Sequence, residues 1–290
     1  MEPNLVTDPA RSRPLLKAAL FLLLSAVAVV VYLFLLSVFR GTLGAFSGAV
    51  PAMVLAVAAF ILNWRFFSAE GRSLAEIGFD RPALRIGQAL IGFVAGGLLV
   101  GIWALVLMAV IPVSWRIAAT FSVGAVAGPI TFAIFNNAGE ELVYRGYLFL
   151  LLSRSYGRVV AVIATCSLFT LLHIQGGVPW LSAVAGVFTS ALVFSALLVR
   201  WRSVPLVLGF HVATNVLQEL LGLRASAMNL FVPISRATVS EAESCEILGA
   251  TAIINTAIAL AIFAFPRRPR PEAPAPAPHV RRADRAPSPR

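Results

Sequence analysis

Seven residues inside apolar stretches of this 290-residue chain have the types and the spacing needed for hydrolytic chemistry. They are Glu140, Glu141, Arg145, Phe169, His173, His211 and Asn215. A charge near the middle of a bilayer costs at least ~2.5–3.5 kcal/mol on insertion scales, so charged groups there need a reason. Carboxylates, imidazoles and amides are groups that move protons and stabilise charge during hydrolysis. The sequence therefore predicts a functional site inside the membrane.

Helical geometry gives the two adjacent glutamates different surroundings. Residues four apart in a helix share a face, whereas direct neighbours diverge by about 100°. Glu141 therefore meets Arg145, and we expect a buried ion pair that supports the site or simply locks helix packing. Glu140 points elsewhere and has no cation on its own helix. This makes Glu140 the carboxylate available as a general base.

Two histidines lie in other apolar stretches, each four residues from a possible partner. Phe169 precedes His173, and Asn215 follows His211. We expect Glu140, helped by His173, to polarise a water molecule for attack on a peptide carbonyl. His211 and Asn215 would donate hydrogen bonds to the oxyanion that forms. Phe169 would pack against the imidazole of His173 and limit the access of water.

The same residue types leave other interpretations open. Glu140, His173 and His211 could instead hold a divalent metal such as zinc, with Glu140 as ligand or base. The spacing does not separate the two kinds of site. A single histidine in a membrane helix can also serve only as a hydrogen-bonding contact between helices. Glu219 would either line the entrance to the site or pair with Arg224.

Eight apolar stretches must position these residues, and they predict an all-α, polytopic membrane helical bundle without a soluble domain. Hydrophobic residues make up 59% of the chain and charged residues only 12%, against about 25% charged residues in soluble domains. The expected transmembrane helices cover residues 15–39, 43–62, 86–111, 121–152, 159–174, 180–199, 205–223 and 247–265. The fourth is expected to bend or break near Gly128-Pro129. Gly96 and Gly97 should allow close helix approach in the third.

The remaining segments are expected to be connections and tails. Residues 1–14 form a cytoplasmic tail, residues 15–265 form the bundle, and residues 266–290 form a disordered Pro/Arg-rich cytoplasmic tail. The connections 112–120 and 224–246 are expected to be loops. Neither of the two cysteines is expected to form a disulfide, because one lies in a span and the other in a loop.

Basic residues predict the orientation of the bundle. With eight spans, 18 of the 23 lysines and arginines fall on the side of the termini and 4 on the other side, while Arg145 lies within a span. Positive charge accumulates on the cytoplasmic side, so both termini are expected in the cytoplasm. Because these basic residues lie at the ends of spans and in the tails, membrane topology and attraction to anionic lipid account for the net charge of +10. Nucleic-acid binding is therefore not indicated. The excess of arginine over lysine points to a bacterial plasma membrane.

The three spaced motifs resemble the signatures of the CPBP family. These are the type II CAAX prenyl endopeptidases and the bacteriocin-processing or abortive-infection (Abi) membrane proteins. The resemblance covers Glu140 to Asn215, within a catalytic core expected at about residues 121–223, and Tyr144 stands where relatives commonly have Phe. It implies an intramembrane endopeptidase that cuts a membrane-associated or lipid-modified protein or peptide. Such enzymes are often labelled metalloproteases, although metal-free, glutamate-dependent catalysis is also argued for.

Two alternatives belong to other classes of protein. A non-catalytic membrane immunity or scaffold protein of the Abi type could retain the polar cluster for packing. A proton-coupled transporter would also place acids and histidines in the middle of the bilayer. No His-Glu-x-x-His motif is present, so a zincin-like site is not indicated.

Overall fold

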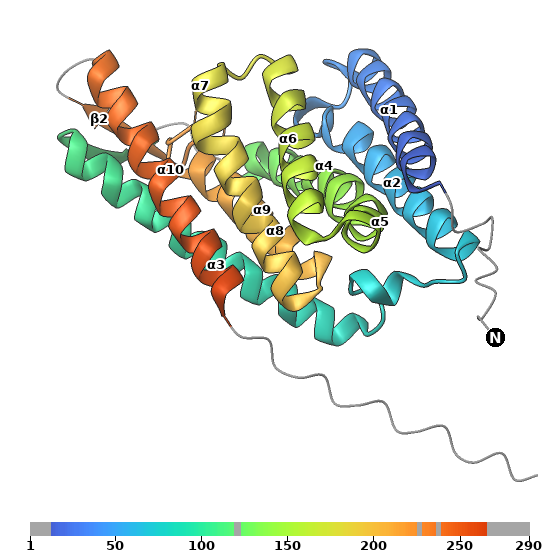
Figure 1. The fold of residues 1–290 in the computed structure, drawn as a ribbon. Helices are drawn as coiled ribbons and strands as arrows, with labels where there is room; N and C mark the ends of the chain where they lie inside the picture. The colour runs from blue at the N-terminus through green and yellow to red at the C-terminus, as the bar shows by residue number, and fades with distance from the viewer. Residues whose placement is uncertain (1–12, 119–122, 225–227, 236–238, 266–290) are drawn as a thin grey trace, which may run out of the picture.

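Long apolar helices make up most of the chain, as expected for an all-α membrane bundle (Figure 1). The computed structural model describes residues 13–118, 123–224, 228–235 and 239–265. Six stretches in this part are long and apolar enough to cross a membrane. They are Pro14–Phe39, Gly44–Ala69, Leu74–Val110, Arg158–Gln175, Trp180–Trp201 and Glu241–Ala264. The expected fold class is confirmed, whereas the expected tails lie almost entirely outside the described residues.

The elements follow one another with short connections. The helices are α1 (Pro14–Phe39), η2 (Gly44–Phe46), α2 (Ala49–Ala69), η3 (Leu74–Ile77), α3 (Pro82–Val110), α4 (Val123–Arg145), α5 (Tyr147–Tyr156), α6 (Arg158–Gln175), α7 (Trp180–Ser182), η4 (Ala183–Phe188), α8 (Thr189–Trp201), α9 (Val204–Leu220) and α10 (Glu241–Ala264). Of these, η2 and η3 are 3-10 helices and η4 is a π-helical segment. The expected fourth and seventh spans correspond to α4 with α5 and to α9, which are not among these six: α4 carries the polar motif, and α9 has only 17 residues.

Of the bend or break expected near Gly128-Pro129, the break is not found there, and the fourth span is interrupted at Gly146 instead. α4 continues past Pro129 and ends at Arg145, and Gly146 separates it from α5. A Cβ on Gly128 would lie 1.9 Å from the carbonyl oxygen of Ala45, so this glycine serves close packing. Asn63 stabilises the real break, because its side chain accepts a hydrogen bond from the Tyr147 amide at 2.6 Å. The second span also extends past residue 62, to Ala69.

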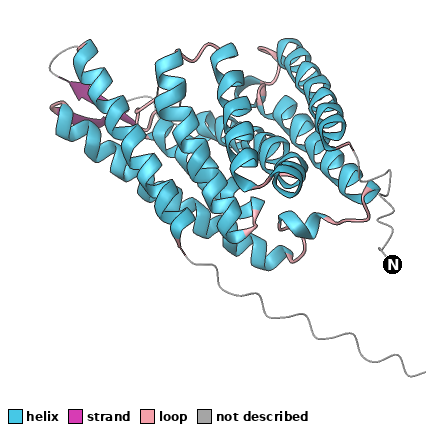
Figure 2. Cartoon of the chain, in the orientation of Figure 1, coloured by secondary structure: helices cyan, strands magenta, loops and turns pink. Residues whose placement is uncertain are grey.

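A two-stranded antiparallel ribbon was not expected in the connections 112–120 and 224–246. β1 (Val113–Ile117) pairs with β2 (Phe231–Ser235), with Val113 opposite Ser235 and Ile117 opposite Phe231 (Figure 2). The Trp115 indole donates to the carbonyl oxygen of Leu221 at 2.9 Å and so fixes the ribbon to the end of α9. Five-residue strands that pair across more than a hundred residues leave little local signal in the sequence.

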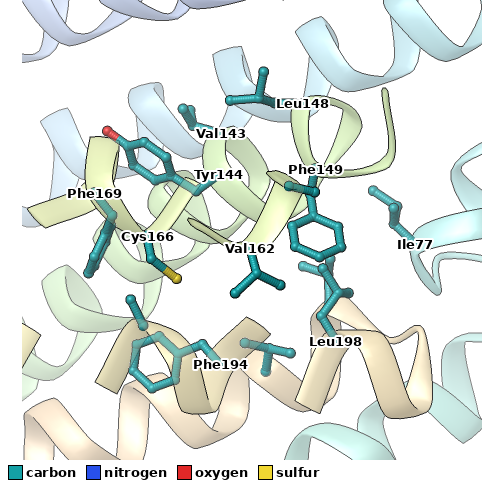
Figure 3. Packing of buried hydrophobic residues seen from close by; sticks show 14 of the residues in the cluster. Ile77, Val143, Tyr144, Leu148, Phe149, Val162, Cys166, Phe169, Phe194 and Leu198 are labelled. Atoms are coloured by element: carbon teal, nitrogen blue, oxygen red, sulfur yellow. The ribbon is translucent and has the colours of Figure 1, made fainter. Parts of the chain in front are cut away.

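Small residues bring α3 and α9 into backbone contact. A Cβ on Gly96 would lie 2.5 Å from the Phe210 carbonyl oxygen, and one on Gly209 would lie 1.9 Å from that of Ala89. The predicted role of Gly96 in close helix approach is confirmed. A buried apolar cluster joins α4, α5, α6 and α8, and Figure 3 shows Phe149, Val162 and Leu198 within it. This cluster holds the C-terminal end of α4 rigidly against its neighbours.

Candidate active site

Side chains from three helices line one cavity of about 870 Å³ within the bundle. α4 contributes Glu140, α6 contributes Phe169 and His173, and α9 contributes His211 and Asn215. Five of the seven residues singled out in the sequence therefore share a cavity. The other two, Glu141 and Arg145, are completely buried behind its wall.

Glu140 faces the cavity with one oxygen held on its own helix. The Asn136 amide donates to Glu140 Oε1 at 2.8 Å. The other oxygen, Oε2, lies 3.7 Å from Nε2 of His211, and the side chain is 23% exposed. Both of these Glu140 contacts come from residues of the site. Arg145, the cation on the same helix, forms its ion pair with Glu141. Glu140 thus combines access to the cavity with a fixed orientation.

Glu141 joins two of the helices that form the site. Its Oε1 accepts from Nη1 of Arg145 at 3.2 Å and from Nδ1 of His211 at 2.8 Å. The rings of Phe169 and Phe194 face the Arg145 guanidinium, with centroids 4.6 Å and 5.4 Å away. The sequence predicts the pair of Glu141 with Arg145, but not the bond from Glu141 to a histidine 70 residues away. This buried carboxylate therefore holds the His211 imidazole in place.

The hydrogen bonds of His173 determine which ring nitrogen is protonated. Nδ1 lies 2.8 Å from the carbonyl oxygen of Phe169. A carbonyl can only accept, so Nδ1 carries the proton and Nε2 of the neutral ring keeps its lone pair. The ring of Phe169 packs against that of His173 at a centroid distance of 4.4 Å, as expected from the sequence. His173 thus offers an acceptor to the cavity.

The α9 pair has partners on α4. His211 Nδ1 is the donor to Glu141, since an ionised carboxylate only accepts. Nδ2 of Asn215 donates to Oδ1 of Asn137 at 3.0 Å, which leaves the second N–H of that amide for other partners. The ring of Phe194 lies 4.5 Å from that of His211 and shields it. Both side chains are therefore held in place by residues of the same bundle.

Three residues of the site were not assigned a role from the sequence. Asn136 stands four positions before Glu140, and this spacing alone could have indicated the contact. Asn137 and Phe194 have partners far away in the chain, so no local pattern points to them. Glu219 and Arg224, considered as a possible pair in the sequence, both line the cavity.

The side chains do not fit a metal ion as they are arranged. Within the described ranges, no three His, Cys, Asp or Glu side chains converge closely enough to hold one. The metal ligand set considered from the sequence, Glu140 with both histidines, is thus not assembled among these residues.

The fold and the site define an integral membrane protein with a carboxylate–imidazole cavity inside its helical bundle. Residues 122–217 match the family described as type II CAAX prenyl endopeptidase Rce1-like. The resemblance to the CPBP, or CAAX protease, family is thereby confirmed, and the matched segment contains all seven residues singled out above. At the level of the family, this match supports a CAAX-protease-like intramembrane endopeptidase. No curated protein and no solved structure matches the chain.

Proposed function

We propose that the protein hydrolyses a peptide bond inside the membrane with Glu140 as general base. The observation that carries this proposal is the shared cavity, into which α4, α6 and α9 bring a carboxylate, two imidazoles and an amide. A scaffold that retains these residues only for packing needs no cavity beside them. The family match over the same helices supports the proposal.

Each group has a defined part in the proposed reaction. Glu140 Oε2 takes a proton from water while Nε2 of His173 accepts a hydrogen bond from the same molecule and orients it. The water oxygen attacks the carbonyl carbon, and the carbonyl oxygen becomes an oxyanion. Glu140 then gives its proton to the leaving nitrogen as the C–N bond breaks. The products are a carboxylic acid and an amine, the acid then passes its proton to the amine, and the enzyme returns to its first state.

The oxyanion would lie near His211 and Asn215. Asn215 has a second N–H for this purpose, since only one hydrogen of its amide is needed by Asn137. His211 uses Nδ1 to bond Glu141, so it can donate to an oxyanion only when Nε2 is also protonated. The proposal therefore requires the imidazolium form of His211 during the reaction. Preorganised donors of this kind are each worth about 10²–10³ in kcat.

The lining of the cavity supports a class of substrate, and the distribution of arginine supports an orientation in the membrane. Apolar side chains such as Trp103, Leu107 and Leu248 line it beside the polar groups. We infer a membrane-associated or lipid-modified protein or peptide as substrate. The distribution of arginine supports a bacterial plasma membrane with both termini in the cytoplasm.

Kinetics in liposomes test the proposal. The purified protein is given internally quenched fluorescent peptides with and without an isoprenylated cysteine. Glu140→Gln and His173→Ala should each lower cleavage about 10²–10⁴-fold while the protein level stays normal. Glu246→Gln makes the same chemical change at an exposed position on α10 and should leave the rate unchanged. Cleavage by the Glu140→Gln protein at the wild-type rate would exclude this mechanism, and loss of the protein itself would favour a packing role.

A further inference from the structure

Two asparagines, three and four residues before Glu140, have no part in the reaction above, although both line the cavity. Asn136 donates to Glu140 Oε1 at 2.8 Å, and Asn137 accepts from Nδ2 of Asn215 at 3.0 Å. Adjacent helix positions diverge by about 100°, so one asparagine reaches along α4 and the other reaches across to α9. Each contacts one residue of the proposed reaction.

We propose that Asn136 and Asn137 are positioning residues for the hydrolysis, which rests on the proposed function. Asn136 fixes the general base, and Asn137 fixes the amide of the oxyanion site. Neither needs to touch the substrate, because each acts through the residue that it holds.

Asn136 restricts a side chain that would otherwise rotate. Glu140 has three rotatable bonds and is 23% exposed, so packing alone does not select one rotamer. The bond to Oε1 leaves Oε2 on the side of His211, 3.7 Å from its Nε2. Displacing a reacting group by about 1 Å can cost about 10²-fold in rate. The bond from Asn136 therefore affects the rate rather than the affinity for substrate.

Asn137 decides which way the amide of Asn215 faces. A primary amide presents a donor at one end and an acceptor at the other. Oδ1 of Asn137 is an acceptor, so it favours Nδ2 of Asn215 and repels its oxygen. If that amide turned over, an oxygen would replace the N–H that the oxyanion needs. Asn137 is only 1% exposed, so water does not compete for the bond between its Oδ1 and Asn215.

Two substitutions at Asn136 separate positioning from simple packing. Asn136→Leu has a similar size but no donor, whereas Asn136→Gln keeps an amide that can reach a carboxylate one turn away. With the quenched peptide that the wild type cleaves, we expect Asn136→Leu to lower kcat about 10–100-fold with KM unchanged. Asn136→Gln should recover most of this loss. An unchanged kcat in Asn136→Leu, or a Gln variant as slow as the Leu variant, would overturn the role of Asn136.

A double-mutant cycle tests Asn137. Asn137→Ala should lower kcat at least about 10-fold, and the double variant with Asn215→Ala should be no slower than Asn215→Ala alone. A further loss in the double variant would show that Asn137 does not act through Asn215. If the Ala protein is not recovered from membranes, Asn137→Ser is used in the same cycle.

Glu140→Gln distinguishes the two levels of failure. If Glu140→Gln cleaves the peptide as fast as the wild type, the proposed function itself fails. If Glu140→Gln is inactive but Asn136→Leu and Asn137→Ala cleave normally, only the positioning roles are wrong.

Discussion

Adjacent glutamates in this chain have different surroundings because one helical step separates their directions. Glu141 is fully buried between Arg145 and His211, whereas Glu140 reaches the cavity. Burial of an ion is costly unless its partners replace the lost water. Glu141 has two such partners on its Oε1, whereas Glu140 has access to the cavity. A glutamate thus has a structural role at position 141, whereas the glutamate at position 140 is the candidate general base.

Removing one member of the buried pair should unfold the site. Arg145→Met leaves the Glu141 carboxylate without its cation, and such a loss typically costs about 3–5 kcal/mol. We expect a large fall in the apparent unfolding temperature in detergent and in the amount of protein in the membrane. Arg158→Met, at an exposed position at the start of α6, is the matched control and should behave like the wild type. Normal stability of Arg145→Met would show that Glu141 needs no cation.

At the scale of elements, the break between α4 and α5 determines where the polar motif ends. Asn63 replaces the missing helical hydrogen bonds: its Nδ2 donates to the Leu142 carbonyl at 2.9 Å, and its Oδ1 accepts from the Tyr147 amide. A Cβ on Gly146 would lie 2.0 Å from Asn63 Oδ1 and 2.3 Å from the Leu142 oxygen. Only glycine leaves room for this arrangement.

Gly146→Ala should therefore destabilise the protein through a clash rather than through backbone preference. Overpacking of this kind costs typically about 1–3 kcal/mol, and we expect a lower unfolding temperature with reduced cleavage. Gly101→Ala is the control, because a Cβ there meets nothing within 4 Å, and replacing a helical glycine by alanine is favourable by roughly 0.5–1 kcal/mol. Equal stability of the two variants would argue against tight packing at the break.

A charged cluster joins the ends of several elements. Glu70, just after α2, accepts from Lys17 at 2.9 Å, from the Tyr147 hydroxyl at 2.8 Å and from Arg154 at 3.2 Å. Burial alone would raise the pKa of Glu70, but the hydrogen bonds and positive charges around it outweigh burial and hold the pKa below its usual 4.5. Glu70 thus links α1, α2 and α5 in its ionised form.

This cluster predicts a loss of stability in acid. A carboxyl group whose pKa is lower in the folded than in the unfolded protein stabilises the fold fully at pH values above the unfolded pKa of about 4.5. This stabilisation is lost as the pH falls from about 4.5 through the pKa of the folded state. The unfolding temperature of the wild type should therefore decrease with pH in that range. Glu70→Gln should be less stable at neutral pH and should lack this part of the pH dependence. Parallel curves for the two proteins would exclude Glu70 as the source.

Sequence patterns could predict the helices and the spaced polar pairs, but not the contacts between elements. Apolar stretches and i,i+4 spacing are local, and they indicate the bundle and the pair of Glu141 with Arg145. The bond of His211 to Glu141, the role of Asn63 and the strand pairing of Val113 with Ser235 join distant segments. Such contacts depend on how whole helices pack, which no short stretch of sequence specifies.

At the scale of the whole molecule, the cavity and the charged cluster lie at different ends of the bundle. Lys17, Glu70 and Arg154 belong to the end where α1 begins and α2 finishes. The cavity is lined by Val113 and Pro233 of the ribbon, which lies at the end where α3 and α9 finish (Figure 1). With the termini in the cytoplasm, as proposed, the cavity lies toward the side away from the cytoplasm, and we expect substrates to approach from the outer leaflet.

The two cysteines provide a direct test of this orientation. Cys245 is exposed in the first turns of α10, beside the cavity end, and Cys166 is buried within α6. A membrane-impermeant maleimide added to intact spheroplasts should label the wild type, and Cys245→Ser should abolish labelling while Cys166→Ser does not. A cysteine introduced by Ser288→Cys into the Cys245→Ser protein should react only after permeabilisation. Labelling of Cys245 only in permeabilised spheroplasts would reverse the orientation and place the cavity on the cytoplasmic side, because Cys245 and the cavity lie at the same end of the bundle.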